Sequence, residues 1–130
     1  MLFALAADII MLLHAGFILF VLFGALLFFR FRPLVLLHLP AAIWGIISEW
    51  RGLVCPLTPL ENRFRALAHQ TGYRGGFIDH YILPVIYPEG LTRNIQFVLG
   101  AIVLGINLLF YGYYAYITHK QRTSSGHRFR

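Results

Sequence analysis

The chain has 130 residues, of which 58% are hydrophobic and only 12% are charged. Soluble domains carry about 25% charged residues and could not bury this much apolar surface, so the composition excludes the soluble classes and predicts a membrane protein. The net charge of +6 comes from Lys and Arg at the ends of apolar segments. That distribution is typical of membrane topology signals, so we expect no nucleic-acid partner. The single cysteine excludes an intrachain disulfide and a Cys-x-x-Cys metal pair.

The first apolar segment, 2–29, is long enough to cross a bilayer, because about 20 apolar residues suffice. It contains two ionisable residues, Asp8 and His14. A cleaved signal peptide has a basic start and a shorter apolar run, whereas here the first positive charge is Arg30. We therefore predict a retained transmembrane helix.

The second segment, 34–50, is close to the lower length limit for a span. Pro40 lies within it and removes one backbone donor, so we expect a kink near its start. On a helix, His38 and Glu49 fall on nearly the same face. Small residues between them would let another helix approach closely, which predicts that this face is turned to the bundle. They are Ala41, Ala42, Gly45 and, at the edge of the face, Ser48.

The connection that follows, 51–91, has the pattern of a helix start. Thr58 fits an N-cap, Pro59 fits the first helical position, and Glu61 fits the third position after the cap. We predict an amphipathic helix from 59 to about 70 that lies in the membrane surface. Its apolar face would carry Leu60, Phe64 and Leu67, with Arg63, Arg65 and His69 elsewhere.

The apolar stretch at 77–87 is too short to span a bilayer and is predicted to be interfacial or re-entrant. Two prolines, Pro84 and Pro88, disfavour a long regular helix there. Three tyrosines of this region suit the lipid headgroup layer. They are Tyr73, Tyr81 and Tyr87.

A third spanning helix is predicted at 92–118, with Gln96 and Asn107 as interhelical hydrogen-bond formers. Its far end forms an aromatic belt of Tyr111, Tyr113, Tyr114 and Tyr116. The basic tail, 120–130, is predicted to be disordered. The fold expected from these elements is an all-α membrane protein. It has one membrane domain, 1–119, with three transmembrane helices and an amphipathic or re-entrant helical insertion between the second and third.

The distribution of positive charge predicts the orientation. Three spans place the turn at 30–33 and the tail on one side of the membrane, where there are six Lys and Arg, and five Lys and Arg lie on the other side. The positive-inside rule gives short loops the most weight. We therefore predict a cytoplasmic turn and tail, and an N-terminus and 51–91 connection on the outer side.

Counting residues along the first two helices predicts which polar groups meet. His14 lies fifteen residues before Phe29, about 22 Å along a helix, and the same count from Leu34 reaches Ser48 and Glu49. Asp8 would lie about 9 Å nearer the outer surface, level with the segment at 55–61. We therefore predict a buried polar pocket under an extracytoplasmic helical cap. Its residues are Asp8, His14, Ser48, Glu49, Cys55, Thr58, Glu61, Asp79 and His80.

Ionisable residues within a membrane are costly and indicate a functional site by default, but each of these also has a structural interpretation. Thr58 and Glu61 fit a helix cap, and a hydrogen bond between His14 and Glu49 could do no more than fix the helix register. Three further residues have a structural interpretation. Asp8 could lie at a hydrated helix end, and Cys55 could be a small packed hydrophobic residue. His38 could be a polar anchor near the cytoplasmic boundary.

Three motifs, at 55–62 (CPLTPLEN), 72–81 (GYRGGFIDHY) and 87–93 (YPEGLTR), carry a resemblance to a known family. Together with Asp8, His14 and the 38–49 segment, they resemble small bacterial integral membrane proteins of the domain of unknown function 2784 family. The resemblance covers nearly the whole chain except the basic tail. It implies a bacterial inner-membrane location and the same segment boundaries, and it implies no activity.

Three functions are consistent with the predicted pocket. The first is an accessory or binding protein in the lipid bilayer that holds a membrane-protein partner or a lipid ligand. The second is a metal or haem site, with His14, Glu49 and His80 as weak candidates because no spacing matches a known metal signature. The third is a membrane enzyme with a Glu49–His14 acid–base pair, or with Cys55 as a nucleophile near His80. We favour the first, and the sequence leaves the cofactor unknown and the enzymatic alternative open.

Overall fold

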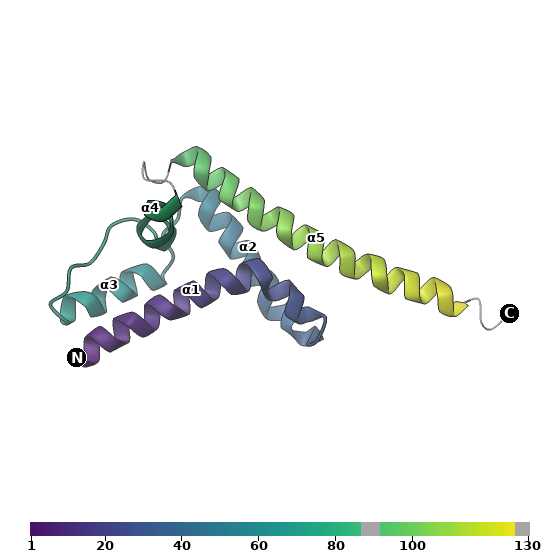
Figure 1. Cartoon of the computed structure of the whole chain (residues 1–130), viewed down its shortest axis with the longest axis horizontal. Coiled ribbons are helices and arrows are strands. Elements are labelled where there is room, and N and C mark those ends of the chain that lie inside the picture. Colours follow the sequence, from purple (N-terminus) through teal and green to yellow (C-terminus); the bar gives the residue numbers. More distant parts are fainter. Residues whose placement is uncertain (87–91, 127–130) are drawn as a thin grey trace.

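The computed structural model describes residues 1–86 and 92–126, and Figure 1 shows the arrangement of its helices. No strand occurs among these residues, so the predicted all-α fold is confirmed. Three helices are long and apolar enough to cross a membrane: Leu2–Phe28, Arg32–Arg51 and Arg93–Ser124. The elements in chain order are α1 (Leu2–Phe28), a 3₁₀ turn (Arg32–Leu34), α2 (Val35–Arg51), α3 (Leu57–Leu67), a π-helical turn (Ile78–Ile82), α4 (Leu83–Ile86) and α5 (Arg93–Gly126).

Small residues allow α1 and α2 to pack closely as antiparallel neighbours. A Cβ atom at Gly24 would collide with the His38 ring, because His38 Nε2 would lie only 3.0 Å away. Gly45 faces Val21 in the same way, with the Cγ1 atom of Val21 3.1 Å from the position of a Cβ atom. Ala42 is also buried. The predicted small-residue face of the second helix is therefore confirmed as a packing face.

One backbone carbonyl of α1 joins all three long helices. Val21 O accepts a hydrogen bond from His38 Nε2 of α2 at 3.3 Å and from Asn107 Nδ2 of α5 at 3.0 Å. Because the carbonyl can only accept, Nε2 carries the imidazole proton, and Nδ1 accepts the Tyr111 hydroxyl at 2.6 Å. The interhelical role predicted for Asn107 is confirmed, and His38 is a fully buried link between helices.

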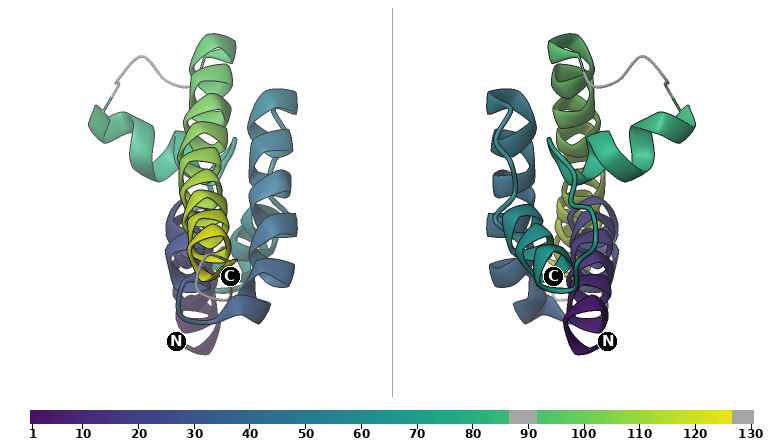
Figure 2. Two further views of the ribbon diagram at one scale, coloured as in Figure 1. Left: turned by 90° about the vertical axis from the view of Figure 1, so that its right-hand side faces the viewer. Right: turned by 90° about the vertical axis from the view of Figure 1, so that its left-hand side faces the viewer.

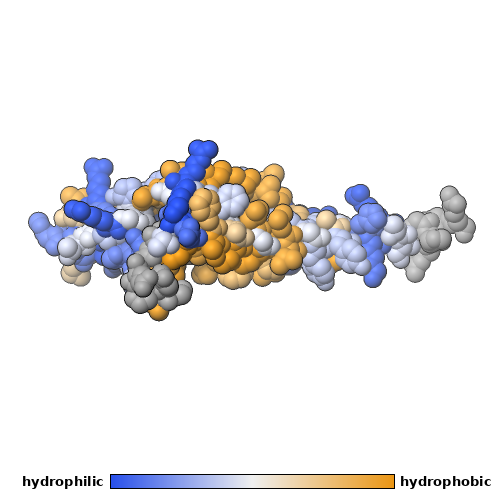
Figure 3. All heavy atoms as spheres, turned by 90° about the horizontal axis from the view of Figure 1, so that it is seen from above, coloured by the Kyte–Doolittle hydropathy of each residue, from blue (hydrophilic) through white to orange (hydrophobic). Residues whose placement is uncertain are grey.

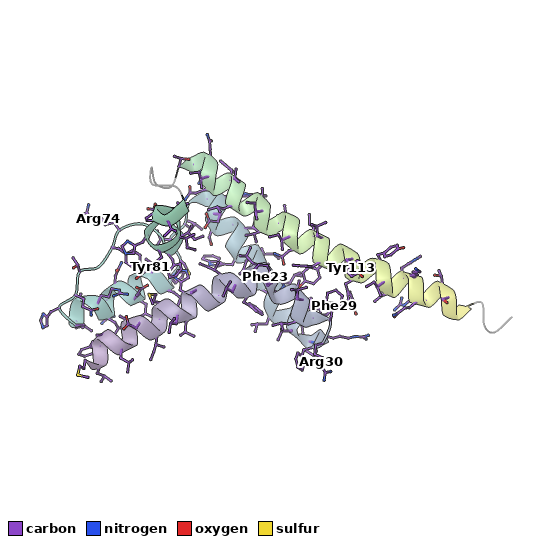
Figure 4. All side chains as sticks on the ribbon, in the orientation of Figure 1. Phe23, Phe29, Arg30, Arg74, Tyr81 and Tyr113 are labelled. Carbon is purple, nitrogen blue, oxygen red and sulfur yellow. The ribbon has the colours of Figure 1, made fainter. Side chains whose placement is uncertain are left out.

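Aromatic side chains join α1 to the far half of α5. The Phe28 ring lies 6.0 Å from Tyr111 and 4.4 Å from Tyr114, and the Phe29 ring lies 6.3 Å from Tyr113. Figure 4 shows Phe29 and Tyr113 near the turn that connects α1 to α2. α5 continues past this level and projects beyond the turn (Figure 1).

The predicted disorder of 120–130 is wrong for 120–126, which continue α5, and 127–130 lie outside the described residues. Lys, Gln and Arg are good helix formers, and extending a formed helix requires no new nucleation. The hydroxyls of Thr118 and Thr123 donate to carbonyls one turn back, at 3.1 and 3.2 Å. These local bonds accompany the helix to its end.

α3 packs along the first half of α1, and Figure 1 shows the two helices running beside each other. The Phe64 ring stacks on Phe3 at 6.3 Å. The predicted amphipathic helix therefore packs on α1 through a residue of its apolar face, and its placement in the membrane surface stays a prediction. The predicted helix start is corrected, since α3 begins at Leu57 after Pro56 and has no side-chain cap.

The segment after α3 returns to the long helices and then leaves them. The π-helical turn and α4 are short, as the position of Pro84 predicted, and Figure 2 shows α4 directed away from the bundle. Phe77 and Leu83 are its buried side chains. The predicted stretch ends at Tyr87, which lies outside the described residues together with Pro88.

The surface of the molecule has a hydrophobic band between two hydrophilic ends (Figure 3). The band consists of large apolar side chains that the fold leaves exposed, which is the surface expected of helices that face lipid. They include Leu12, Leu19 and Phe23 of α1, Leu37 and Ile43 of α2, and Val98, Ile102 and Leu108 of α5.

Candidate functional site

A cavity of about 390 Å³ lies between α1, α2, α5 and the segment at 75–82. Most of its wall is apolar, with Phe17, Val21, Trp44 and Phe77 among the lining residues. The polar side chains of the wall come from each of the elements that enclose it. They are His14, Ser48, Glu49, Cys55, Asp79 and Gln96.

His14 and Glu49 line this cavity from different helices, which agrees with the prediction that they lie at the same depth. Only 3% of His14 is exposed, and its ring lies 4.4 Å from the ring of Phe77. Each residue has one buried polar atom that has no hydrogen-bond partner among the described residues, His14 Nδ1 and Glu49 Oε2. The two side chains are therefore close enough to share a cavity without bonding to each other.

The other polar lining residues are held by local contacts. The Ser48 hydroxyl donates to the Trp44 carbonyl of its own helix at 2.6 Å. Asp79 lies over Gly75, whose positive φ of 84° suits glycine and where a Cβ atom would come within 2.7 Å of Asp79 Oδ2. Cys55 is half-buried at the rim.

A second buried group, the Glu61 cluster, consists of Glu61, Arg65, Tyr73 and Tyr81. Glu61 has no exposed surface, and its Oε1 accepts Arg65 Nε at 2.9 Å and the Tyr81 hydroxyl at 2.8 Å. Its Oε2 accepts the Tyr73 hydroxyl at 2.7 Å. Arg65 Nη2 also donates to the Tyr81 oxygen at 3.0 Å and lies 3.9 Å from an oxygen of Asp8. Figure 4 shows Tyr81 beside α3.

The protonation states in the Glu61 cluster follow from burial and from these bonds. Burial raises the pKa of Glu61, but the hydrogen bonds from Tyr73, Tyr81 and Arg65 outweigh it, so the pKa lies below its ordinary value. Burial and hydrogen bonding to Glu61 both raise the pKa of Tyr73 and of Tyr81. At neutral pH the cluster is therefore one carboxylate that is held by two protonated phenols and one guanidinium.

The Glu61 cluster fastens the wall of the cavity to α3. Tyr73 precedes the lining segment at 75–82 and Tyr81 lies within it, and the Phe77 ring lies 4.8 Å from Tyr81. Asn62 holds the start of this segment through two bonds to the Tyr73 backbone, at 2.8 and 3.1 Å. This segment of the cavity wall and α3 therefore form one hydrogen-bonded unit.

The nine residues proposed from the sequence fall into two neighbouring groups and one outlier. His14, Ser48, Glu49, Cys55 and Asp79 line the cavity. Thr58 and Glu61 are buried at the Glu61 cluster, with Asp8 at its edge beside Arg65. His80 is exposed, stacks on Tyr73 with 4.1 Å between the rings, and does not line the cavity.

The described residues do not form the cluster of donors that a typical metal site uses. No group of three His, Cys, Asp or Glu side chains with metal-binding geometry occurs among them. His80 lies outside the cavity wall that holds His14 and Glu49. Both ring nitrogens of His38 are already hydrogen-bonded, so this histidine has no free nitrogen for an iron atom.

Sequence reasoning missed three residues of the Glu61 cluster. Arg65 was expected away from the apolar face of its helix, and Tyr73 and Tyr81 were expected in the headgroup layer. One available signal was the spacing of Glu61 and Arg65, which favours an ion pair on a helix. The tyrosines carried no comparable signal, because their contacts depend on the path of the loop.

Comparison with known proteins identifies the family of the chain. No curated protein and no solved structure matches it. A family model described as "Protein of Unknown function (DUF2784)" matches residues 4–112, a range that includes every residue of the cavity and of the Glu61 cluster. The chain therefore belongs to the DUF2784 family.

Proposed function

We propose that this protein is a binding protein of the bacterial inner membrane that holds a small ligand, or part of a lipid, in the cavity between its long helices. The observation that carries the proposal is the pair of unpartnered buried atoms, His14 Nδ1 and Glu49 Oε2, on residues that line that cavity. A buried polar atom without a partner costs about 1–3 kcal/mol, and a ligand that bonds to it recovers that cost.

The size and the lining of the cavity support a small ligand. Its volume of about 390 Å³ is near the lower end of the range for ligand pockets, about 300–1,000 Å³. Apolar walls with a few polar groups suit a molecule that has an apolar body and one polar head. An amphiphile that reaches the protein through the bilayer has this character.

The proposed orientation puts the cavity in the outer half of the membrane. Arg30 and Arg32 at the first turn, with Lys120 and Arg122 on the projecting end of α5, make that side the more positive one per residue. The positive-inside rule then favours a cytoplasmic turn. α3 and the segment at 75–82 would then cover the cavity from the outer side of the membrane.

A test is to identify what the purified protein carries. We expect native mass spectrometry in a mild detergent to detect a bound small molecule or lipid on the wild-type protein, and organic extraction to release it. The double variant His14→Leu/Glu49→Leu should fold, because apolar groups of similar size often replace buried polar pairs without loss of stability. It should lose the bound molecule.

Leu108→Ala is the matched control, since Leu108 is a lipid-facing residue of α5 with 63% exposure. This variant should retain the wild-type amount of ligand. An equal content of bound molecules in the wild type and in the folded double variant would contradict the proposal.

A further inference from the structure

We infer that the ligand of this cavity carries a positively charged amine, with Glu49 as its counter-ion. The inference rests on the proposed function and adds the chemical class of the ligand. It starts from the distribution of charge, because the chain has eleven Lys and Arg against five Asp and Glu. Two of those acids, Glu49 and Asp79, line the cavity, and none of the Lys and Arg residues that the structure describes does.

The contrast between Glu61, which is buried, and Glu49, which is half-buried, indicates what Glu49 lacks. Glu61 accepts hydrogen bonds from Arg65 and from two phenols, so its charge is compensated within the protein. Glu49 Oε2 is also buried, but no described residue donates to it. A carboxylate at membrane depth without a cation is costly, so a charged donor from outside the chain is the complement that the site requires.

One basic side chain close to the cavity, Arg93, is already engaged. Arg93 lies next to Gly52, a lining residue. Its guanidinium donates to the Trp50 carbonyl and to Gln96 Oε1, and its cationic centre lies 4.8 Å from the Phe97 ring. Arg93 therefore stays on α5 and does not serve as the counter-ion of Glu49.

The rest of the lining suits an ammonium group on an apolar body. The rings of Phe17, Trp44 and Phe77 line the cavity, and aromatic faces attract cations, with tryptophan the strongest. His14 adds a buried ring nitrogen, Nδ1, that has no partner among the residues that the structure describes. A cation beside Glu49 with its chain among these rings would meet both the charged and the apolar parts of the wall.

The test compares three probes of equal chain length on the full chain in a neutral maltoside detergent. We expect n-octylamine to bind saturably by calorimetry and about tenfold more tightly than n-octanol, with n-octanoate weakest. Glu49→Gln should lose this preference, whereas Asp8→Asn, which removes an exposed acid outside the cavity, should keep it. The wild-type ranking decides the inference even if a Glu49 variant fails to fold.

Equal affinity for the amine and the alcohol, or preference for the carboxylate, would overturn the amine while leaving a binding protein. Binding of none of the three would overturn the proposed function as well. A second arm identifies the source of the amine, using nanodiscs of phosphatidylglycerol with or without phosphatidylethanolamine. Retention of phosphatidylethanolamine in native mass spectra points to the lipid headgroup, and octylamine binding without lipid retention points to a free amine.

Discussion

Glu61 fits a local helix-capping pattern in the sequence, yet its carboxylate bonds to residues far along the chain. Its position after Thr58 fits a capping box, but its two oxygens bond to Tyr73 and Tyr81, 12 and 20 residues later in the chain. A buried carboxylate with three donors is more stable than one that caps an exposed helix end, so the tertiary contacts prevail. The glycine-containing loop that brings the tyrosines back makes this possible.

The Glu61 cluster predicts a stability that depends on pH. The pKa of Glu61 is lowered in the folded protein, so its contribution is present above the ordinary value of about 4.5 and is lost as pH falls through the lower folded value. We expect the free energy of unfolding in detergent to be constant from pH 7 to about 5 and to fall below that. Glu61→Gln should cost about 1–3 kcal/mol at pH 7 and remove this decline.

Arg63→Gln is the control for this measurement, because Arg63 is exposed on the same helix and belongs to no part of the Glu61 cluster. Circular dichroism over a denaturant series at each pH provides the readout. An unfolding free energy of Glu61→Gln that declines with pH as in the wild type would refute the role assigned to the carboxylate.

Residue-level prediction succeeded where geometry alone decides and failed where the loop path decides. Counting along two antiparallel helices put His14 and Glu49 at one depth, because helix rise is constant and the turn is short. Nothing comparable relates Tyr73 to Glu61, since the intervening residues have no fixed rise. His80 was misplaced for the same reason, being one residue away from a tyrosine that points to the buried cluster.

At the scale of elements, the distance between α1 and α2 depends on residues without side chains. Gly24 contacts the His38 ring, and His38 in turn bonds to α5 through Tyr111, so one glycine determines how three helices meet. Gly16, two turns earlier on α1, has no atom within 4 Å of the position that a Cβ atom would occupy, so an alanine side chain fits there. The two glycines are chemically identical and differ only in what faces them.

Alanine substitutions should therefore separate the two positions. We expect Gly24→Ala to cost about 1–3 kcal/mol, because His38 or the whole helix must shift. Gly16→Ala should be neutral or stabilise by up to about 1 kcal/mol through better helix propensity. Unfolding of both variants by graded addition of a denaturing detergent measures the difference, and equal effects would show that close approach at Gly24 is unimportant.

The helices themselves were predictable because hydrophobic segment length leaves little choice in a membrane. The end of α5 was not, since a basic, polar composition fits both a disordered tail and an exposed helix. The packing of α3 was not predictable for another reason. Its apolar face suggested lipid, but Phe64 of that face stacks on Phe3 of α1, and Thr58 and Glu61 are buried at the Glu61 cluster.

At the scale of the whole molecule, the hydrophobic band separates two polar ends, and the distribution of Lys and Arg predicts which end faces the cytoplasm. In a background with Cys55→Ser, we expect Arg74→Cys to react with a membrane-impermeant maleimide in cells whose outer membrane has been made permeable and whose inner membrane is intact. Ser124→Cys should react only after lysis, because the projecting end of α5 carries Lys120 and Arg122 and should remain cytoplasmic. The reverse labelling pattern would invert the topology and place the cavity in the inner leaflet.

The meeting point of the three long helices also bears on whether a ligand could pass along the bundle. Val21 lines the cavity, and its carbonyl receives His38 and Asn107, while Phe28, Tyr111 and Tyr114 pack in the space beyond. Toward the turn at 30–33, the cavity is therefore closed at the level of Val21 by packed side chains. A bound molecule of the proposed kind would stop at this junction, so the closure suits retention or sensing and does not suit passage across the membrane.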